Sequence, residues 1–508
     1  MRKAKVYFLN GLTVSFVGLV LRFAAMAYTV YVSGKLGAEG MGLLSLVSSV
    51  HTLALTLASS GVNLTCTRLC ADALALGNYR ETRRSLKGCI LYSLFFGLFA
   101  AVLLYSLSGF LGNSVLKDPR TVVCLRALCP VLPVSALTAC FSGYMNACRR
   151  AFKGSLVSIF ETGLKILLTA FFFSLLLSKG QGVEAVTYSA ALSETVAFLL
   201  LCLILMADTR KNLPKSGKAL PRLSKRLLGI SLPLAAAAWV RSALVTAEHI
   251  LIPRGLRAYG VEKALGTYGI MHGMALPVIF FPYAILTPFT SLLMPEIARF
   301  KAEKKEKNIS FCTALTLRLT LLFAFGCSAL FVLFGEELGF DLYKTEGVGR
   351  MISLFALLIP VMYADTATDS VLKGLGEQVY CMKVNIADAA ISLLLVIFLV
   401  PRMGAYGYLI TVFLSECFNT FFSVQKLRKR TGFTLSFLRS VLLPGACAFL
   451  SASLVKLLWN FLKGERFGFW LLFPALVLFL LLYLPLLSLT KALFPQDKRY
   501  FKRLFKGK

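Results

Sequence analysis

Charged residues are scarce in this chain. Only 16% of its 508 residues are Asp, Glu, Lys or Arg, whereas 57% are hydrophobic and the mean hydropathy is +0.75. A water-soluble globular domain carries a larger share of charged residues than this. The composition therefore excludes that class and favours an integral membrane protein.

Several motifs that carry chemistry are also absent. The sequence has no GxxxxGK[ST] phosphate loop, no HExxH or GxSxG motif and no long polar domain. Its thirteen cysteines form no CxxC pair and no zinc-binding spacing, so we expect them to pack as small hydrophobic residues. We expect no enzyme activity, no cofactor and no metal site. A membrane glycosyltransferase or polymerase is a remote alternative, for which the acids Glu336, Glu337 and Asp341 are the only hint.

The chain nevertheless carries a strong positive charge, with 55 Lys and Arg against 24 Asp and Glu and a net charge of +31. A nucleic-acid-binding protein would concentrate that charge on one surface. Here the basic residues gather in short segments between apolar runs, most clearly in "RFKAEKKEKN" (299–308) and "QKLRKRTG" (425–432). This distribution is typical of cytoplasmic loops, so we expect a lipid bilayer and no nucleic acid as partner.

Apolar runs long enough to cross a bilayer, about 20 residues each, recur along the whole sequence, and we predict fourteen transmembrane helices. With a cytoplasmic N-terminus, the inner segments hold roughly three times as many Lys and Arg as the outer loops, which supports this orientation. The chain is thus predicted to be a multi-pass plasma-membrane protein with both termini in the cytoplasm. The predicted helices cover residues 7–33, 41–66, 86–110, 121–147, 154–178, 184–207, 226–253, 265–295, 310–334, 349–372, 380–400, 404–424, 437–460 and 468–490.

The two halves of the chain resemble each other. "VSIFETGLKILL" (157–168) aligns with "VNIADAAISLLL" (384–395), and "YSAALSE" (188–194) aligns with "YLITVFLSE" (408–416). We therefore expect an all-α fold in which two six-helix bundles are related by a parallel repeat, an architecture of alternating-access transporters. The predicted domains are a first bundle at 1–210, a cytoplasmic linker at 211–226, a second bundle at 227–425, and helices 13 and 14 with a basic tail at 426–508.

Two arginines lie deep inside apolar runs: Arg22 in the first predicted helix, and Arg241 in the first helix of the second half. A charge at the bilayer centre costs about 2.5–3.5 kcal/mol, so each arginine needs a polar environment. Neither has an acid one turn away in its own helix. The guanidinium fork suits phosphate oxygens, so contact with an anionic substrate in a central cavity is one interpretation. An internal ion pair, with Glu248 as one candidate acid, is the other.

Histidines in the apolar runs are weaker candidates. His249, which follows Glu248, and His272 could line a cavity or relay protons, although a histidine in an apolar helix more often forms a packing hydrogen bond. A simpler interpretation is also available for Glu161 and Lys165, whose i, i+4 spacing is that of an intrahelical ion pair.

Four acids are candidates for coupling transport to H+ or Na+. Asp365 and Asp369 lie one turn apart on one helical face and could bind a cation, or they could interact with Lys373. Glu194 and Glu416 each follow a serine in the aligned segments of the two halves. Ionisable groups inside a membrane are expected to face a bundle interior or a watery cavity.

Several segments together resemble the stage V sporulation protein B family, polysaccharide-type flippases of the multidrug/oligosaccharidyl-lipid/polysaccharide exporter superfamily. The most specific is "ILIPRGLRAYGVEKALGTYGIMHGMALPVIFFP" (250–282), followed by "SLLMPEIARFKAE" (291–303). The segments "GKLGAEGMGLLSLVSSV" (34–50), "SGVNLTCTRLCAD" (60–72) and "VLKGLGEQ" (371–378) fit the same pattern, whereas "YMNACRRAFKGSLVSIFE" (144–161) departs from it.

This resemblance implies a MATE-like fold of two six-helix bundles around a central cavity. It also implies transport of an undecaprenyl-pyrophosphate-linked sugar, for example the peptidoglycan lipid intermediate, to the outer leaflet in cell-wall or spore-cortex synthesis. Cell-wall synthesis proteins would then be partners. In related lipid II flippases, arginines of the cavity-lining first helices contact the pyrophosphate, and Arg22 and Arg241 are the matching residues. A cation-coupled multidrug exporter of the same superfamily is the alternative.

Overall fold

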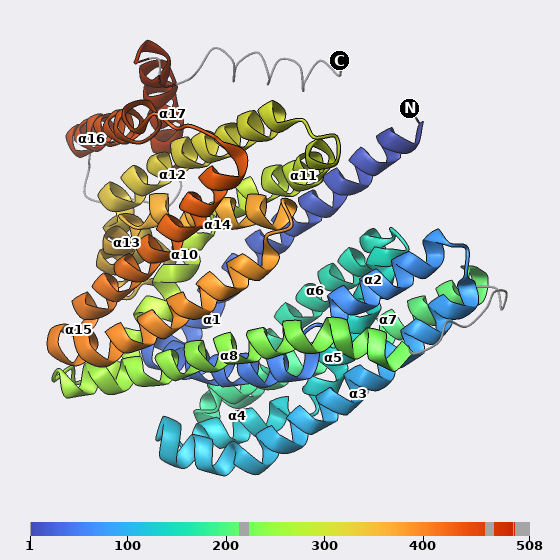
Figure 1. The fold of residues 1–508 in the computed structure, drawn as a ribbon. Coiled ribbons are helices and arrows are strands. Elements are labelled where there is room, and N and C mark those ends of the chain that lie inside the picture. Colours follow the sequence, from blue (N-terminus) through green and yellow to red (C-terminus); the bar gives the residue numbers. More distant parts are fainter. Residues whose placement is uncertain (1, 213–222, 463–471, 491, 493–508) are drawn as a thin grey trace. The chain divides into compact units, whose positions relative to one another are not determined.

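The computed structural model describes residues 2–212, 223–462, 472–490 and 492. Every regular element within these residues is a helix (Figure 1), as the apolar runs predict. The chain divides into two compact units, which are described separately below.

Unit 1 comprises Met1–Gly269 together with the short segment Val396–Pro401. Its first helix packs along α3, α8 and α9, and α6 pairs with α7. The helices of unit 1 are α1 (Arg2–Ser59), α2 (Val62–Ala75), α3 (Tyr79–Phe110), α4 (Arg120–Leu128), α5 (Val131–Ala147), α6 (Ala151–Leu176), α7 (Gly182–Asn212), α8 (Leu223–Ala258) and α9 (Ala264–Tyr268), with the short π-helix η1 (Leu111–Leu116) and the short 3-10 helix η2 (Leu177–Lys179).

Unit 2 comprises Ile270–Leu395 and Arg402–Lys508. Its centre is α12, which packs against α13, α14 and α16. Its helices are α10 (Leu276–Phe280), α11 (Tyr283–Ala302), α12 (Glu306–Tyr343), α13 (Val348–Ala356), α14 (Ile359–Gly374), α15 (Gln378–Thr431), α16 (Leu443–Leu462) and α17 (Leu472–Leu489), with the short π-helices η3 (Gly269–Ala275) and η4 (Leu438–Leu442).

The units follow packing more than sequence order. α8, which begins within the predicted linker at 211–226, and α9 belong to unit 1, and α8 packs against α1, α2 and α3. Residues 213–222 of that linker lie outside the described residues.

Two helices are interrupted by a glycine with positive φ. Gly37 (φ 67°) lies inside α1, and Gly404 (φ 59°) lies inside α15. Residues with a Cβ rarely adopt such angles, so glycine allows the chain to turn here without a loop. Each kink separates two of the predicted runs, 7–33 from 41–66 and 380–400 from 404–424.

Eight segments of the described chain are long and apolar enough to cross a membrane, or up to ten if two bent helix pairs each form one span. The bent pairs are α4 with α5, at 41°, and α13 with α14, at 59°. Two of the eight segments, Val17–Ala75 and Gln378–Thr431, contain the kinks and are far longer than the roughly 20 residues of one crossing. The protein is therefore a multi-pass membrane protein, while the number fourteen and the repeat stay predictions.

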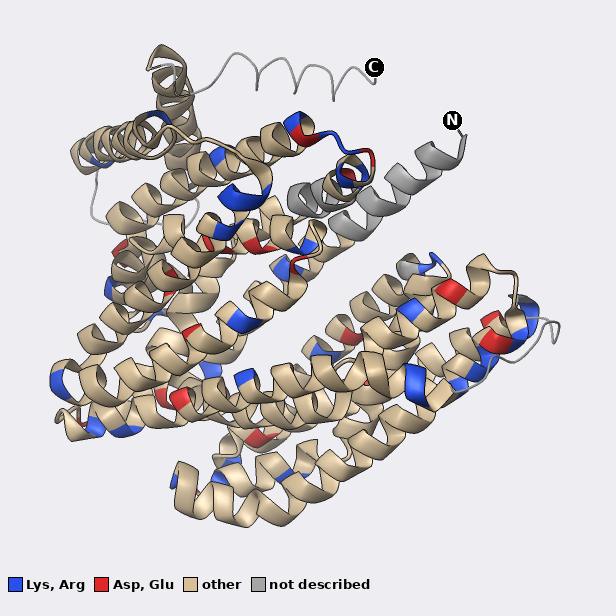
Figure 2. Ribbon diagram, viewed as in Figure 1, with Lys and Arg blue, Asp and Glu red and all other residues tan. Residues whose placement is uncertain are grey.

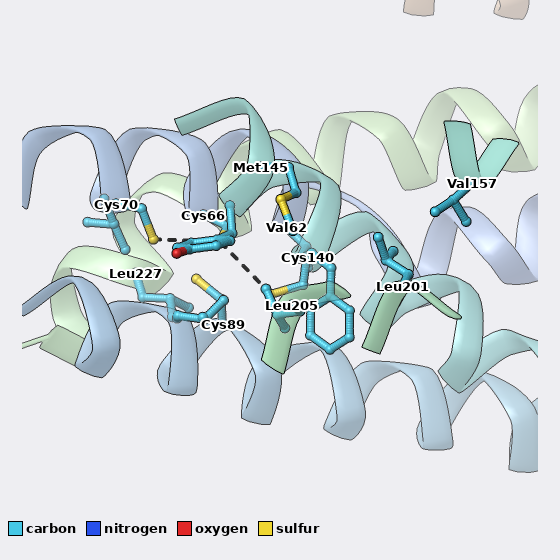
Figure 3. Close-up of a cluster of buried hydrophobic side chains, with 14 of the residues drawn as sticks. Val62, Cys66, Cys70, Cys89, Cys140, Met145, Val157, Leu201, Leu205 and Leu227 are labelled. Atoms are coloured by element: carbon cyan, nitrogen blue, oxygen red, sulfur yellow. Dashed lines mark hydrogen bonds between the residues drawn. The ribbon is translucent and has the colours of Figure 1, made fainter. Parts of the chain in front are cut away.

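The core of unit 1 contains an unusual number of cysteines. Cys66 and Cys70 from α2, Cys89 from α3 and Cys140 from α5 are almost completely buried against aliphatic side chains (Figure 3). The sulfur of Cys66 lies 3.9 Å from that of Cys70 and 3.9 Å from that of Cys140. All thirteen cysteines are free, and nine of them are buried, as expected for small hydrophobic residues.

Charged residues gather mainly toward helix ends and connecting turns, and the ribbon between them is largely uncharged (Figure 2). The exceptions, acids and bases within the long apolar helices, are the sequence-predicted candidates. Their surroundings define the candidate site.

Candidate functional site

Arg22 and Arg241 both belong to unit 1. Arg22 lies on α1 before the Gly37 kink, and Arg241 lies near the middle of α8. Both side chains are exposed, and neither forms a hydrogen bond or ion pair with any residue that the structure describes. Unit 1 thus carries two guanidinium groups in apolar helices whose charge no described acid neutralises.

α8 is held in place beside the second part of α1 by polar contacts. Trp239 Nε1 and the Ser242 hydroxyl reach the backbone and side chain of Thr56, each at 3.3 Å, and Thr246 donates to the carbonyl of Ser49 at 3.2 Å. Arg241 lies between these contacts in sequence and projects from a different face of the helix. Its position is therefore fixed by its neighbours rather than by an ion pair of its own.

His249 has a structural partner. Its Nδ1 lies 2.8 Å from the hydroxyl of Tyr268, a fully buried side chain on α9, and the two rings meet edge to face. Glu248 interacts electrostatically with the same tyrosine. The hydrogen bond of His249 is the one that the packing interpretation predicts.

His272 belongs to unit 2, whereas His249 belongs to unit 1. The ring of His272, within η3, lies 5.1 Å from the ring of Tyr408 on α15. The two histidines are thus placed in different surroundings, each beside a tyrosine.

Lys165 stands at the centre of a polar cluster in unit 1. Its ammonium group lies 5.1 Å above the ring of Tyr28, and it attracts both Glu161 and Glu194 electrostatically. The Ser135 hydroxyl donates a hydrogen bond to Glu194. The spacing of Glu161 and Lys165 predicts an intrahelical ion pair, but among the described residues the lysine is shared between carboxylates of α6 and α7. We call these five residues the Lys165 cluster.

A second polar cluster lies within unit 2. Asn419 Nδ2 donates to Asp365 Oδ2 at 3.3 Å and to Asn385 Oδ1 at 3.1 Å. Asn385 in turn donates to Asp369 Oδ2 at 3.4 Å, and Lys373 pairs with the same oxygen at 3.2 Å. We call Asp365, Asp369, Asn385 and Asn419 the acid–amide cluster.

The acid–amide cluster holds more acceptor oxygens than donors. Asp365 Oδ1, Asp369 Oδ1 and Asn419 Oδ1 are buried and accept no hydrogen bond from the described residues. Two further acids of α15 interact with Asp365 electrostatically: Asp388 and Glu416. Lys373 is a basic residue that acts on Asp365, and nearly half of its side chain is exposed. Such a site favours a bound proton or a small cation, because unpaired carboxylates are costly away from water.

Two acids that neighbour the acid–amide cluster align in sequence with members of the Lys165 cluster. Glu161 aligns with Asp388, and Glu194 aligns with Glu416. Lys165 aligns with Ser392, so the cluster in unit 2 lacks the internal cation that balances its counterpart.

Sequence reasoning missed the neutral members of both clusters. Asn385 and Asn419 are amides inside apolar runs, and Tyr28 and Ser135 are common residues in membrane helices. The two amides could have been recognised from the sequence, because a polar side chain in a membrane-spanning helix needs a polar partner. Within the described chain, no group of three or more His, Cys, Asp or Glu residues is arranged to hold a metal ion.

Comparison with known proteins identifies relatives. Residues 8–295 match the family model described as polysaccharide biosynthesis protein. Stage V sporulation protein B of Bacillus subtilis (strain 168) is 24% identical over 417 residues, which is 80% of each chain.

Solved structures share the fold. An inward-facing multidrug resistance MATE transporter of the MOP superfamily matches with a TM-score of 0.65 at 15% identity, over 83% of this chain and 100% of that one. A MOP superfamily transporter from Pyrococcus furiosus, described as having a binding pocket of reversed polarity, matches with a TM-score of 0.63 at 15% identity, over 84% and 95%. At this identity the likeness concerns the fold, which is MATE-like.

Proposed function

Because the chain belongs to the polysaccharide biosynthesis protein family, we propose that it flips an undecaprenyl-pyrophosphate-linked sugar precursor from the inner to the outer leaflet of the plasma membrane. Alternating access would carry the head group across. The cargo would be a peptidoglycan lipid intermediate or another polysaccharide unit, used in cell-wall or spore-cortex synthesis beside the enzymes of that process. The family and the MATE-like fold support a transporter rather than an enzyme.

The observation that carries the proposal is the pair of unneutralised arginines. Arg22 and Arg241 project from apolar helices of unit 1, and neither forms an ion pair with an acid among the described residues. A guanidinium group forms two parallel hydrogen bonds with phosphate oxygens, and these bonds strengthen where water is excluded. A diphosphate moving through a low-dielectric protein interior needs such positive groups.

Glu248 and the two histidines have supporting parts in this proposal. Glu248 lies two helical turns beyond Arg241 on α8 and would pair with the arginine in another state of the transport cycle. His249, held by Tyr268, would fix the outer end of α8. His272, which lies beside Tyr408, is a separate candidate for a hydrogen bond to substrate.

The acid–amide cluster supports coupling to a cation, H+ or Na+. Loading one positive charge would satisfy the free oxygens of Asp365 and Asp369, and its release would return the repulsion among the acids. Glu416 adds to the negative charge around Asp365, whereas the charge of Glu194 in unit 1 is balanced by Lys165. We therefore propose unit 2 as the coupling site.

A cation-coupled multidrug exporter is the second candidate, and the surplus of acids in unit 2 is the feature that favours it. The two functions require substrates of opposite charge: an anionic pyrophosphate lipid for the flippase and an organic cation for the exporter. Proteoliposomes containing the purified protein, supplied with a fluorescent undecaprenyl-pyrophosphate sugar or with a lipophilic organic cation, distinguish them. The flippase proposal predicts movement of the pyrophosphate lipid alone; export of the organic cation with no movement of the lipid would refute it.

A further inference from the structure

Lys165 is a positive charge built into an apolar helix of unit 1. It lies within Phe152–Lys179, one of the segments long and apolar enough to cross a membrane. Glu161 on the same helix and Glu194 on α7 repel each other electrostatically, and Lys165 attracts both. Because carboxylates away from water are costly without a positive partner, this lysine compensates two acids at once.

Contacts with α1 and α7 keep this part of α6 in place. The ammonium group of Lys165 lies 5.1 Å from the centroid of the Tyr28 ring, and it also acts electrostatically on His51 of α1. The hydroxyls of Tyr28 and Thr169 lie 3.0 Å apart, and those of Thr169 and Ser189 on α7 lie 2.6 Å apart. Hydrogen bonds thus join three helices beside the lysine, so its charge stays near the two carboxylates.

Unit 2 has the corresponding acids without the lysine. Asp388 and Glu416 align with the two acids of unit 1, and both repel Asp365 electrostatically. Ser392, a buried residue one turn after Asp388, stands at the position that aligns with Lys165. The negative charge of unit 2 therefore has no lysine at the place where unit 1 has one.

Two sources of positive charge can satisfy such acids: a lysine of the protein, or a cation taken from solution. A lysine is always present, so the acids beside it do not gain or lose a cation when the gradient changes. A site without the lysine fills or empties with the cation concentration. Lys373 does not remove this difference in unit 2, because nearly half of its side chain is exposed and solvent screens its charge.

We propose that Lys165 takes in unit 1 the place that a coupling cation takes in unit 2, so that unit 2 alone responds to the cation gradient. The inference rests on the proposed coupling at the acid–amide cluster and adds a residue that sets how many cations the protein binds in each cycle. Removing the lysine should then create a second cation site, and adding a lysine at Ser392 should block the first.

Sodium binding to the purified full-length protein tests the first consequence, with radioactive sodium in alkaline buffer as the probe. Lys165→Ser leaves Glu161 and Glu194 without a positive charge and leaves room for an ion, so we expect about one more bound sodium ion per chain than in the wild type. Lys165→Arg keeps the charge and should bind no more sodium than the wild type. Lys179→Ser, at an exposed position of η2, is the matched control.

The added sodium should depend on the acids of the cluster. Combining Lys165→Ser with Glu194→Gln removes one acid together with the lysine, so sodium binding should return to the wild-type level. Size-exclusion chromatography checks that each variant is folded. A folded Lys165→Ser protein that binds no more sodium than the wild type would overturn the inference.

Ser392→Lys tests the second consequence in unit 2, and it decides the matter if Lys165→Ser does not fold. The new lysine would follow Asp388 by four residues, the spacing and order that Lys165 has after Glu161. We expect the gradient-driven flipping rate in proteoliposomes to fall to the rate without a gradient. Ser392→Met, which has similar bulk but no charge, should respond to the gradient more strongly. A wild-type response of Ser392→Lys, or an equal loss in both variants, would contradict the inference.

The two readouts separate this inference from the proposed function. A wild type that neither binds sodium nor responds to a gradient would refute coupling in unit 2, while extra sodium in Lys165→Ser would still support Lys165 as the built-in cation. If the wild type is coupled, and Lys165→Ser and Ser392→Lys both behave like it, the flippase and its coupling stand and the inference fails.

Discussion

Asn419 donates a hydrogen bond to one oxygen of Asp365 across 3.3 Å, and the other oxygen of that carboxylate accepts none from the described residues. The amide thus orients a carboxylate without neutralising it. Three more acids interact with Asp365, which gives unit 2 a local excess of negative charge. This arrangement is the basis of the first prediction.

Asp365→Asn should uncouple transport from the cation gradient. The variant keeps the shape of the side chain but removes one charge, so we expect the gradient-driven rate to fall about tenfold or more. Its thermal unfolding temperature in detergent should not fall, because removing an unpaired buried charge is neutral or stabilising. Glu346→Gln, at an exposed position, is the control. A variant that still responds fully to the gradient would exclude Asp365 from coupling.

Arg241→Lys should be a poor substitute. Lysine keeps the positive charge but loses the fork that binds two phosphate oxygens at once. We expect flipping of the pyrophosphate lipid to fall to roughly a tenth of the wild-type rate, since about 1.4 kcal/mol corresponds to a factor of ten. Equal rates for the two proteins in proteoliposomes would show that Arg241 supplies charge alone.

Glu377 should make the stability of unit 2 depend on pH. This residue precedes α15 and pairs with Lys426 at 3.2 Å and Arg430 at 2.6 Å. Its partial burial raises its pKa, but the hydrogen bonds and charges of Lys426 and Arg430 outweigh that effect and hold the pKa below the ordinary 4.5. The stabilisation is thus fully present above pH 4.5 and is lost as the pH falls through the lowered pKa.

Glu377→Gln measures this contribution. We expect the variant to be less stable than the wild type at pH 7 by about 1 kcal/mol, the upper end for partly exposed ion pairs. The difference should disappear in strong acid, where the wild-type carboxyl is protonated as well. Thermal unfolding of both proteins in detergent across this pH range checks it; a constant difference at every pH would contradict the ion-pair origin.

Gly339→Ala should weaken the contact between α12 and α13. A Cβ on Gly339 would lie 2.4 Å from the Cα and backbone nitrogen of Gly349, so the two helices must separate. We expect a loss of about 1–3 kcal/mol, as for other overpacked sites. Gly163→Ala on α6 is the matched control, since its Cβ meets nothing within 4 Å and alanine favours the helix. In detergent, the thermal unfolding temperature of Gly163→Ala should equal or exceed that of the wild type, and the unfolding temperature of Gly339→Ala should be lower.

The sequence predicted the features that depend on local composition. Apolar runs indicated membrane helices, and the absence of paired cysteine motifs correctly indicated that Cys66 and Cys140 pack as hydrophobic residues. The kinks were harder to predict, because Gly37 and Gly404 are two of 38 glycines and nothing local marks their positive φ.

Features that depend on distant contacts could not be predicted. Asn419 reaches residues 34 and 54 positions away, and Lys165 interacts with Glu194 of another helix as well as with its intrahelical neighbour Glu161. Periodicity cannot reveal such partners, because they are set by which helices pack together.

The central claim is that Arg22 and Arg241 carry the pyrophosphate through the membrane. The most direct measurement is the flipping rate of a fluorescent undecaprenyl-pyrophosphate sugar in proteoliposomes containing Arg22→Ala, Arg241→Ala or the control Arg257→Ala, an exposed arginine at the end of α8. The account predicts a loss of about 30-fold or more for each of the first two, as expected for removing a charge contact of about 2 kcal/mol, with the control unchanged. Wild-type rates for Arg22→Ala and Arg241→Ala, in protein that folds and inserts normally, would contradict it.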